Sequence, residues 1–186
     1  SAMAPVALLD PQPGEWVCDL CAAPGGKSTQ IAGRLLGEGF LLCNEYSPKR
    51  AKILSRNIER MGVANALVTN EAPAVLAQRF AGMFDKVLVD APCSGEGMFR
   101  RDGAVMKAWE RNGPDYFYGI QKEIVRDAVT MLKPGGYILY STCTFSPEEN
   151  EAVITHLLRK NPRMKVIPME DYEGFSPGIT HYRSET

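Results

Sequence analysis

The stretch DLCAAPGGKST, residues 19–29, decides the fold, because its glycine turn joins an apolar run to a helical pattern. Its ending, Gly-Lys-Ser-Thr, also closes the phosphate loop G-x-x-x-x-G-K-[ST] of nucleotide triphosphate sites. Counted back from Gly26, the first glycine of that loop would stand at position 21, where this chain has Cys. Pro24, inside the turn, has no N–H to offer a phosphate oxygen. The spacing therefore disfavours a triphosphate site.

The same turn fails the dinucleotide fingerprint G-x-G-x-x-G. Gly25 and Gly26 are adjacent, and no third glycine follows them at the required spacing. An NAD-dependent oxidoreductase is therefore disfavoured. What remains is a turn that lets a ligand approach the backbone at the start of a helix.

Outward from the turn, strand-like and helical patterns alternate along the chain. Apolar, strand-like runs lie at 16–20, 40–44, 66–69, 86–90 and 137–141, with a weaker one at 164–169. Helical patterns lie at 27–36, 48–61, 72–80, 119–133 and 147–160. The stretch 94–118 is irregular, and we expect it to be the long loop of the domain. This alternation predicts an α/β protein with a doubly wound, mostly parallel sheet.

Bulk properties bound the class of protein. The chain has 186 residues, of which 45% are hydrophobic and 23% charged, as in an ordinary soluble domain. It shows neither an apolar run of transmembrane length nor a signal-peptide pattern, so no membrane partner is expected. Five cysteines, an odd number, favour reduced thiols and a cytoplasmic location.

Charge alone argues mildly against a nucleic-acid partner, since the net charge is −1. The charge is uneven, however. Residues 49–60 are basic, and a second basic cluster lies between Arg100 and Arg111. Taken alone, both clusters are interpreted as solvated helix faces.

Ligands of such sheets bind beyond the carboxyl ends of the strands, so the strand ends nominate a site. Glu45 ends the second run, 19 residues after Gly26, where an acidic side chain accepts hydrogen bonds from ribose hydroxyls. An unphosphorylated ribose without a pyrophosphate suits this arrangement. S-adenosylmethionine is such a ligand, and the alternative is that Glu45 is only a surface carboxylate.

Two further strand ends carry reactive groups. DAPCSG, residues 90–95, follows the fourth run, and STCT, residues 141–144, follows the fifth. We expect Cys93 and Cys143 to lie close together at the same sheet edge, with Asp90 and Lys27 near them. Cys18 and Cys43 sit inside strand runs and are expected to be buried apolar residues. No metal site is expected, because the C-x-x-C at 18–21 has neither a second pair nor nearby histidines.

Two thiols and an acid beside a methyl donor point to the methylation of a pyrimidine carbon. Carbon 5 of cytosine is a poor nucleophile until a thiolate adds to carbon 6 and turns the ring into an enamine. An acid near ring nitrogen 3 stabilises the developing charge, and a base then removes the proton from carbon 5.

The motifs DLCAAPGGKST, DAPCSGEGMFRRD and YSTCTFSPEENEAVI closely resemble the RNA cytosine-5 methyltransferases of the Sun-like family. The likeness is nearest to the bacterial enzymes acting on 16S ribosomal RNA of the small subunit, and it runs from residue 1 to about residue 155. It implies a Rossmann-like class I methyltransferase sheet that lacks its last strand, S-adenosylmethionine as methyl donor, and RNA as partner. The cofactor residues it implies are Cys21, Ala22, Ala23, Pro24, Gly25, Gly26, Lys27, Glu45, Arg50, Asn70 and Asp90.

The resemblance also implies the catalytic roles. Cys143 is the nucleophile, Cys93 assists product release, and Lys27 and Asp90 face the target cytosine. The residues alone leave the nucleophile open, because DNA cytosine-5 methyltransferases use the Cys of a Pro-Cys dipeptide, which would select Cys93. One departure concerns the adenine contact. Ala72 stands where the family commonly has Asp, so Asn70 or the adjacent glutamate is expected to replace it.

Extent is the second departure from the family pattern. Residues 1–170 are expected to be the catalytic core, and 171–186 a polar tail or an unfinished element. Family members also carry RNA-binding flanks, so we expect a core taken from a longer, monomeric protein. A different class remains open, namely a non-catalytic, RNA-associated module that keeps the cofactor pocket.

Overall fold

The computed structural model describes residues 3–100, 103–168, 176 and 178. Its elements fall in two compact units, which are described separately. The sheet unit comprises residues up to 91 together with 124–141. The thiol unit comprises 92–123 and the residues from 142 onward, and it is named for Cys93 and Cys143.

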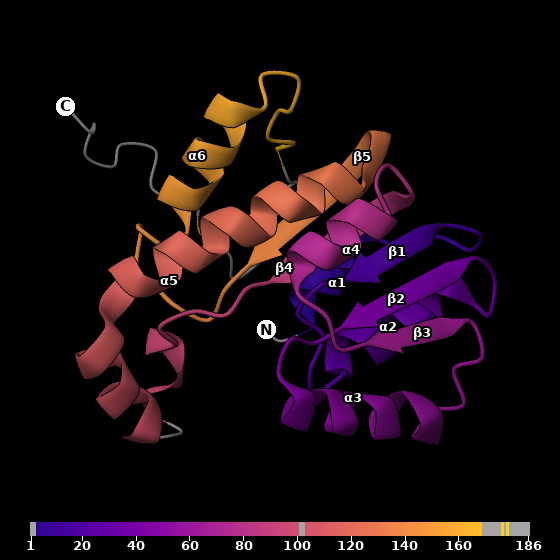
Figure 1. The fold of residues 1–186 in the computed structure, drawn as a ribbon, viewed down its shortest axis with the longest axis horizontal. Coiled ribbons are helices and arrows are strands. Elements are labelled where there is room, and N and C mark those ends of the chain that lie inside the picture. The colour runs from indigo at the N-terminus through magenta and orange to yellow at the C-terminus, as the bar shows by residue number, and fades with distance from the viewer. Residues whose placement is uncertain (1–2, 101–102, 169–175, 177, 179–186) are drawn as a thin grey trace. The chain divides into compact units, whose positions relative to one another are not determined.

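Five parallel strands form the sheet in the order β3-β2-β1-β4-β5 (Figure 1). Their bounds are β1 Trp16–Asp19, β2 Phe40–Asn44, β3 Ala66–Thr69, β4 Phe84–Asp90 and β5 Leu132–Ser141. The direction of strand addition reverses between β1 and β4, so this is the topological switch point of the sheet. In parallel α/β sheets, ligands bind beyond the carboxyl ends of the strands at that point.

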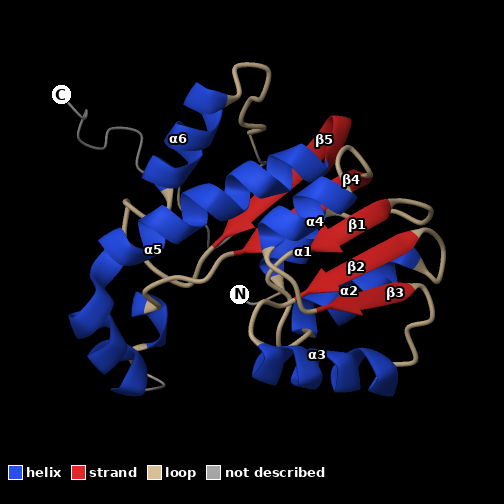
Figure 2. Ribbon diagram, viewed as in Figure 1, coloured by secondary structure: helices blue, strands red, loops and turns tan. Residues whose placement is uncertain are grey.

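Helices of the sheet unit connect and flank these strands (Figure 2). Their bounds are α1 Ala4–Leu9, α2 Gly26–Leu35, α3 Pro48–Arg60 and α4 Pro73–Arg79. Right-handed crossovers place α2 and α3 on one face of the sheet, and α4 with the last turns of α5 on the other. The doubly wound α/β prediction is therefore confirmed.

Alternating strand residues build a core on each face. Val17, Leu41 and Leu88 are fully buried and form one cluster with α1, α2 and α3. Cys18 and Leu42, one position along, are also fully buried on the opposite side of the pleat. Both Cys18 and Cys43 are fully buried, which confirms that they are core residues; burial raises the pKa of Cys43 to about 12.

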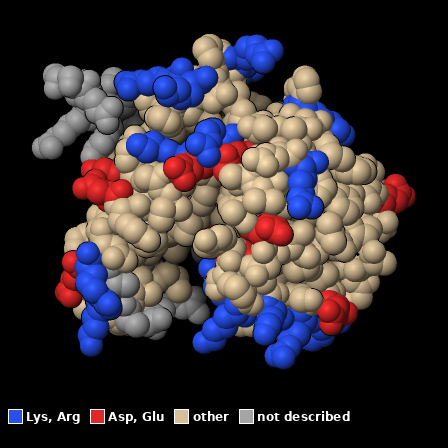
Figure 3. Space-filling model, in the orientation of Figure 1, with Lys and Arg blue, Asp and Glu red and all other residues tan. Residues whose placement is uncertain are grey.

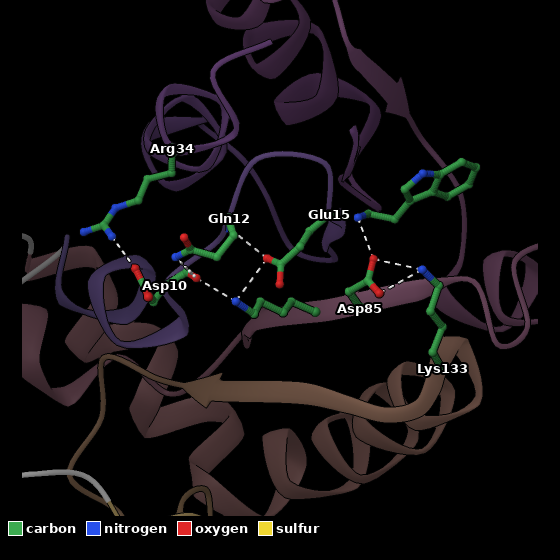
Figure 4. Close-up of polar contacts among 8 residues, drawn as sticks. Asp10, Gln12, Glu15, Arg34, Asp85 and Lys133 are labelled. Atoms are coloured by element: carbon green, nitrogen blue, oxygen red, sulfur yellow. Dashed lines mark hydrogen bonds and ion pairs between the residues drawn. The ribbon is translucent and has the colours of Figure 1, made fainter. Parts of the chain in front are cut away.

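Ion pairs and hydrogen bonds close the amino ends of β1 and β4 (Figure 4). Lys86 donates to the carbonyl of Asp10 at 2.6 Å and pairs with Glu15 at 3.0 Å. Asp85 accepts the N–H of Trp16 at 2.8 Å and binds Lys133 at 2.8 Å. We call these residues the amino-edge network.

The thiol unit holds the 3₁₀ helix η1 Glu96–Met98, the first part of α5 Gly103–Met131, and α6 Glu151–Lys160. The helix of α5 is broken at Gly113, where φ is 64° and ψ is 175°. The prediction of an irregular loop over 94–118 was therefore wrong from Gly103 onward. The glycines of this stretch favoured a loop in the sequence interpretation, although the residues between them are good helix formers. Pro114 suits the first turn of the second helical segment.

One other prediction needs correction, and one helix was not predicted. The weak strand predicted at 164–169 is absent over 164–168, which have no regular structure, and residue 169 lies outside the described residues. The short helix α1 was not predicted. The proposed tail at 171–186 falls almost wholly outside the described residues. No helix in the described part of the chain is long and apolar enough to span a membrane.

Candidate active site

The glycine turn connects β1 to α2 at the switch point. Gly25 caps α2 in the left-handed region at φ 112°, and a Cβ there would lie 3.1 Å from Leu54 Cδ1. Gly26, the first residue of α2, differs, because a Cβ there would meet no atom within 4 Å. No side chain caps α2, and no acidic residue lies in its first turn. The turn thus offers backbone N–H groups beside open space.

Helix α3 fastens the turn from the side. Arg50 donates to the carbonyl of Ala23 at 2.7 Å, and Asn57 donates to the carbonyl of Pro24 at 2.7 Å. Both carbonyls belong to residues that the sequence placed around the cofactor. The backbone of the turn is therefore held by side chains of a neighbouring helix and not by its own contacts alone.

Glu45 lies directly after β2 and is only 5% exposed. One of its carboxylate oxygens accepts the Ser47 N–H at 2.9 Å, and the other lies 3.5 Å from Arg50. These contacts hold the carboxylate in one orientation at the carboxyl edge. Tyr46, the next residue, leaves its aromatic side chain 72% exposed.

Two asparagines order the ends of β2 and β3. Asn44 is fully buried, donates to the carbonyls of Leu20 and Glu71, and accepts from Thr69 Oγ1 at 2.9 Å. Asn70 donates to the carbonyl of Glu45 at 2.6 Å, so it braces the loop that carries Glu45. The predicted contact between Asn70 and adenine stays a prediction.

A buried acid lies beneath the turn at the end of β1. Asp19 is fully buried, and one oxygen accepts the Ser28 hydroxyl at 2.6 Å. Its other oxygen has no hydrogen-bond partner among the described residues. Burial raises the pKa of Asp19 to about 7, with the Asp90 carboxylate adding to the rise. The carboxyl end of β1 therefore holds an acid that titrates near neutral pH.

Lys27 and Asp90 meet in the sheet unit, and their predicted position beside the two thiols stays a prediction. Lys27 Nζ lies 2.6 Å from one oxygen of Asp90, and Ser141 donates to the other at 2.8 Å. The side chains of Lys27 and Asp90 are 20% and 33% exposed, so the pair remains accessible. The end of β4 thus presents a carboxylate held between an ammonium group and a hydroxyl.

The thiol unit brings Cys93 and Cys143 together, as the sequence predicted. Their sulfur atoms are 3.2 Å apart, and the Cys143 N–H donates to Cys93 Sγ at 3.4 Å. Cys143 is exposed, whereas Cys93 is partly buried. The hydrogen bond with Cys143 and partial burial raise the pKa of Cys93 well above its ordinary value. The two thiols, which are not joined in a disulfide, therefore share one hydrogen bond in which either sulfur can be the donor.

Buried polar contacts fix the two loops that carry the thiols. Ser94 Oγ lies 2.9 Å from Thr144 Oγ1, so the residues that follow the two cysteines are linked. Glu149 accepts the Ser94 N–H and the Gln121 amide, each at 2.9 Å. Gly97 donates to the carbonyl of Cys143 at 2.9 Å, where an added Cβ would collide with that oxygen.

Sequence reasoning missed several of these supporting residues. Asn44 and Ser141 each end an apolar strand run, so their positions at the carboxyl edge could be predicted, but their bracing contacts could not. Gln121 and Glu149 carry no comparable signal, because Gln121 binds the carbonyl of Pro92 and Glu149 binds the Ser94 N–H, both far away in the sequence. The Lys27–Asp90 pair belongs to one unit and the thiols to the other, so their joint action remains a prediction. Among the described residues, no three His, Cys, Asp or Glu side chains gather as a metal-binding group.

The sequence matches a known protein family and is similar to named bacterial proteins. The family model described as 16S rRNA methyltransferase RsmB/F matches residues 6–183. The chain is 40% identical over 185 residues to ribosomal RNA small subunit methyltransferase F of Klebsiella pneumoniae (strain 342), covering 97% of this chain and 39% of that protein. It is 41% identical over 184 residues to the protein of the same name from Escherichia coli O139:H28, covering 97% and 38%.

A solved structure shows the same fold. The crystal structure of NSun6 from Pyrococcus horikoshii, solved with the S-adenosylmethionine analogue SFG, matches with a TM-score of 0.82 at 33% identity. The match covers 95% of this chain and 44% of that one. The chain therefore spans about two-fifths of the length of the relatives it matches.

Proposed function

The chain belongs to the 16S rRNA methyltransferase RsmB/F family, and we propose that it transfers a methyl group from S-adenosylmethionine to carbon 5 of a cytosine in small-subunit ribosomal RNA. The observation that carries this proposal is the pair of reduced thiols, Cys93 and Cys143, with sulfur atoms 3.2 Å apart. A protein that only binds a cofactor needs neither thiol. Methylation at a pyrimidine carbon needs a nucleophile and a group that helps release it.

The sheet unit suits S-adenosylmethionine by its own features. The fixed Glu45 carboxylate accepts the ribose hydroxyls, and the exposed Tyr46 ring beside it offers a face to adenine. The open space at Gly26 and the free N–H groups of α2 lie on the other side of the turn. When bound, S-adenosylmethionine supplies an electrophilic methyl group. The SFG bound to the Pyrococcus protein supports this assignment.

The two thiols have different roles, Cys143 as nucleophile and Cys93 in product release. The Cys143 thiolate adds to carbon 6 of cytosine, and the resulting enamine lets carbon 5 take the methyl group. Cys143 is the exposed member of the pair, which favours it as nucleophile. The hydrogen bond with Cys143 is the largest cause of the raised pKa of Cys93. After methyl transfer, Cys93, as a thiolate whose own proton has passed to solvent, takes the proton from carbon 5. The electrons of the C5–H bond then restore the C5–C6 double bond and expel the Cys143 thiolate.

Asp90 and Lys27 are proposed to act on the cytosine ring. The Asp90 carboxyl, held by Lys27 and Ser141, is proposed to face ring nitrogen 3 and to stabilise the charge that develops there. An rRNA substrate and reduced thiols are consistent with the proposed cytoplasmic location. We keep residues 1–170 as the proposed core and expect RNA-binding segments to flank it in the longer relatives.

The cofactor assignment is tested by calorimetric titration with S-adenosylmethionine, NAD and ATP in parallel. We expect only S-adenosylmethionine to bind, and Glu45→Ala to weaken it by about 1–3 kcal/mol, because ribose donors lose a fixed acceptor. Glu38→Ala is the matched control, since Glu38 is exposed and lies before β2. Equal affinity in the two variants would remove Glu45 from the site.

The transfer itself is tested by mass spectrometry of nucleosides from treated 16S rRNA. We expect 5-methylcytosine with this chain at low yield, and more with a longer form that includes the flanking segments. Cofactor binding without transfer by either form would favour the non-catalytic module.

A further inference from the structure

Helix α3 presents three different faces, and two of them are already explained. Ala51, Leu54 and Ile58 are buried against the sheet. Arg50 and Asn57 donate to the carbonyls of the glycine turn. The third face carries four exposed cations, which we call the cation stripe: Lys49, Lys52, Arg56 and Arg60.

Helical geometry places the stripe directly opposite the core. At about 100° per residue, the four cations fall within about 80° of arc, centred roughly 180° from the buried residues. Lys and Arg side chains gather along the lower edge of the molecule over α3 (Figure 3). The stripe extends about 17 Å at 1.5 Å per residue, a length that can face several successive phosphates.

One exposed acid of α3, Glu59, lies beside the stripe, and it accepts a hydrogen bond from Ser55 at 2.9 Å. None of the four cations makes an ion pair with any residue in the described ranges 3–100 and 103–168. In α5, by contrast, Lys or Arg alternates with Glu or Asp along the helix. An ordinary solvated face mixes charges as α5 does, and the whole chain has a net charge of −1. The excess of positive charge on α3 is therefore local.

The cation stripe begins close to the carboxyl edge of the sheet. Lys49 lies four residues after Glu45, so the stripe starts at the carboxyl edge and runs away from it along the same unit. A strand of RNA that reaches the carboxyl edge would have its phosphates within reach of this face. We propose that the cation stripe of α3 binds the phosphate backbone of the RNA substrate, an inference that rests on the proposed function and extends it.

The test compares two triple variants with the same change in net charge. Lys49, Lys52 and Arg56 are changed to Gln in one, and Arg34, Arg79 and Lys133 to Gln in the other. Arg34 and Lys133 are ion-paired with Asp10 and Asp85, and Arg79 lies at the end of α4. Binding of a fluorescent single-stranded RNA oligonucleotide to the 186-residue chain is measured against salt concentration.

We expect the stripe variant to lower the slope of log K against log salt by about 2 and to weaken binding on the order of 100-fold near 0.1 M salt, at about 0.7 per phosphate contact. The control variant should change both much less. Thermal unfolding of the stripe variant and S-adenosylmethionine affinity of both variants should match the native chain, whereas loss of the Lys133–Asp85 pair should lower the unfolding temperature of the control. Equal losses in both variants, an unchanged stripe variant, or no RNA binding by the native chain would overturn the proposal.

Two further measurements, poly-glutamate binding and methyl transfer, distinguish RNA from other partners and this proposal from the proposed function. Poly-glutamate binding with the same affinity and the same loss in the stripe variant would show that the stripe takes acidic polypeptides instead. Methyl transfer is assayed independently with the native chain. Its absence both from this chain and from the longer form with its flanks would sink the proposed function, while the salt slopes would still decide whether α3 contacts RNA.

Discussion

The two edges of the same sheet treat charge in opposite ways. In the amino-edge network, Lys86 and Asp85 each have partners of opposite charge or polarity at hydrogen-bond distance (Figure 4). At the carboxyl edge, Asp19 is buried and one of its oxygens has no partner among the described residues, while Glu45 is held by the Ser47 N–H and by Arg50 at 3.5 Å. The amino edge is arranged for stability, and the carboxyl edge keeps groups that a bound molecule would satisfy.

The acid groups of the two edges show this difference in their pKa values. Partial burial alone would raise the pKa of Asp85, but hydrogen bonds from Lys133 and the Trp16 N–H bring it below its usual value. Burial raises the pKa of Asp19 to about 7. Substitutions at the amino edge should therefore lower stability and leave function intact, whereas substitutions of the polar side chains at the carboxyl edge and in the loops that follow should lower function without lowering stability.

The largest effect is expected from the thiols that follow β4 and β5. Cys143→Ala should lower methyl transfer by roughly 10⁴-fold or more, because removing a covalent nucleophile removes the whole pathway. It should form no covalent adduct with RNA. Cys93→Ala should attack RNA and transfer the methyl group but release it poorly, so a denaturant-resistant complex should accumulate.

Denaturing gels with RNA and S-adenosylmethionine resolve the two variants, and a longer form of the chain with its flanks strengthens the signal. Cys43→Ala, at a fully buried thiol, is the control and should behave as the native chain. A trapped complex in Cys143→Ala, with none in Cys93→Ala, would reverse the roles. No complex in either variant, with transfer intact, would end the covalent mechanism.

Asp19→Asn should abolish a pH-dependent loss of stability. An unfolded Asp titrates near 3.9, so between about pH 4 and 7 the folded state binds more protons and its stability falls as pH rises. A folded pKa of about 7 corresponds to a loss of about 4 kcal/mol across that window, complete above pH 7. The variant should lack this fall and be more stable than the native chain at pH 8.

Urea unfolding across this pH range measures the effect. Asp85→Asn is the control of opposite sign, because a lowered folded pKa contributes stability at neutral pH that is lost as pH falls through it. If the free energy of unfolding changed with pH in the same way for the native chain and for Asp19→Asn, ionisation of Asp19 would not destabilise the folded state.

The sequence predicted the sheet and its edge well, for identifiable reasons. Each strand run is short and apolar with a polar end, so the five described strands and residues such as Asp90 could be located directly. The helix from Gly103 was missed because single glycines dominate a local pattern that longer-range packing overrides. Supports such as Glu149 for Ser94 join residues far apart in the chain, and local pattern carries no information about such pairs.

A smaller effect is expected at the amino edge. Lys86→Met keeps the length of the side chain but leaves Glu15, partly buried, without its cation. We expect a loss of about 1–3 kcal/mol in the free energy of unfolding, the cost of an unsatisfied buried polar group. S-adenosylmethionine affinity, measured by calorimetry, should stay within error. A large loss of affinity with normal stability would contradict the division between the edges.

The two adjacent glycines of the turn give the finest test of that division. Gly25→Ala should destabilise by about 1–3 kcal/mol, because alanine is strained at φ 112° and its Cβ would press on Leu54. Gly26→Ala should be neutral or stabilise by up to about 1 kcal/mol, since its Cβ meets nothing and it lies in a helix. If S-adenosylmethionine occupies the open space at Gly26, that harmless methyl group must still weaken its binding. Thermal unfolding and calorimetry on the two variants separate a glycine required by the backbone from one required by the ligand, and full affinity in Gly26→Ala would move the cofactor away from this turn.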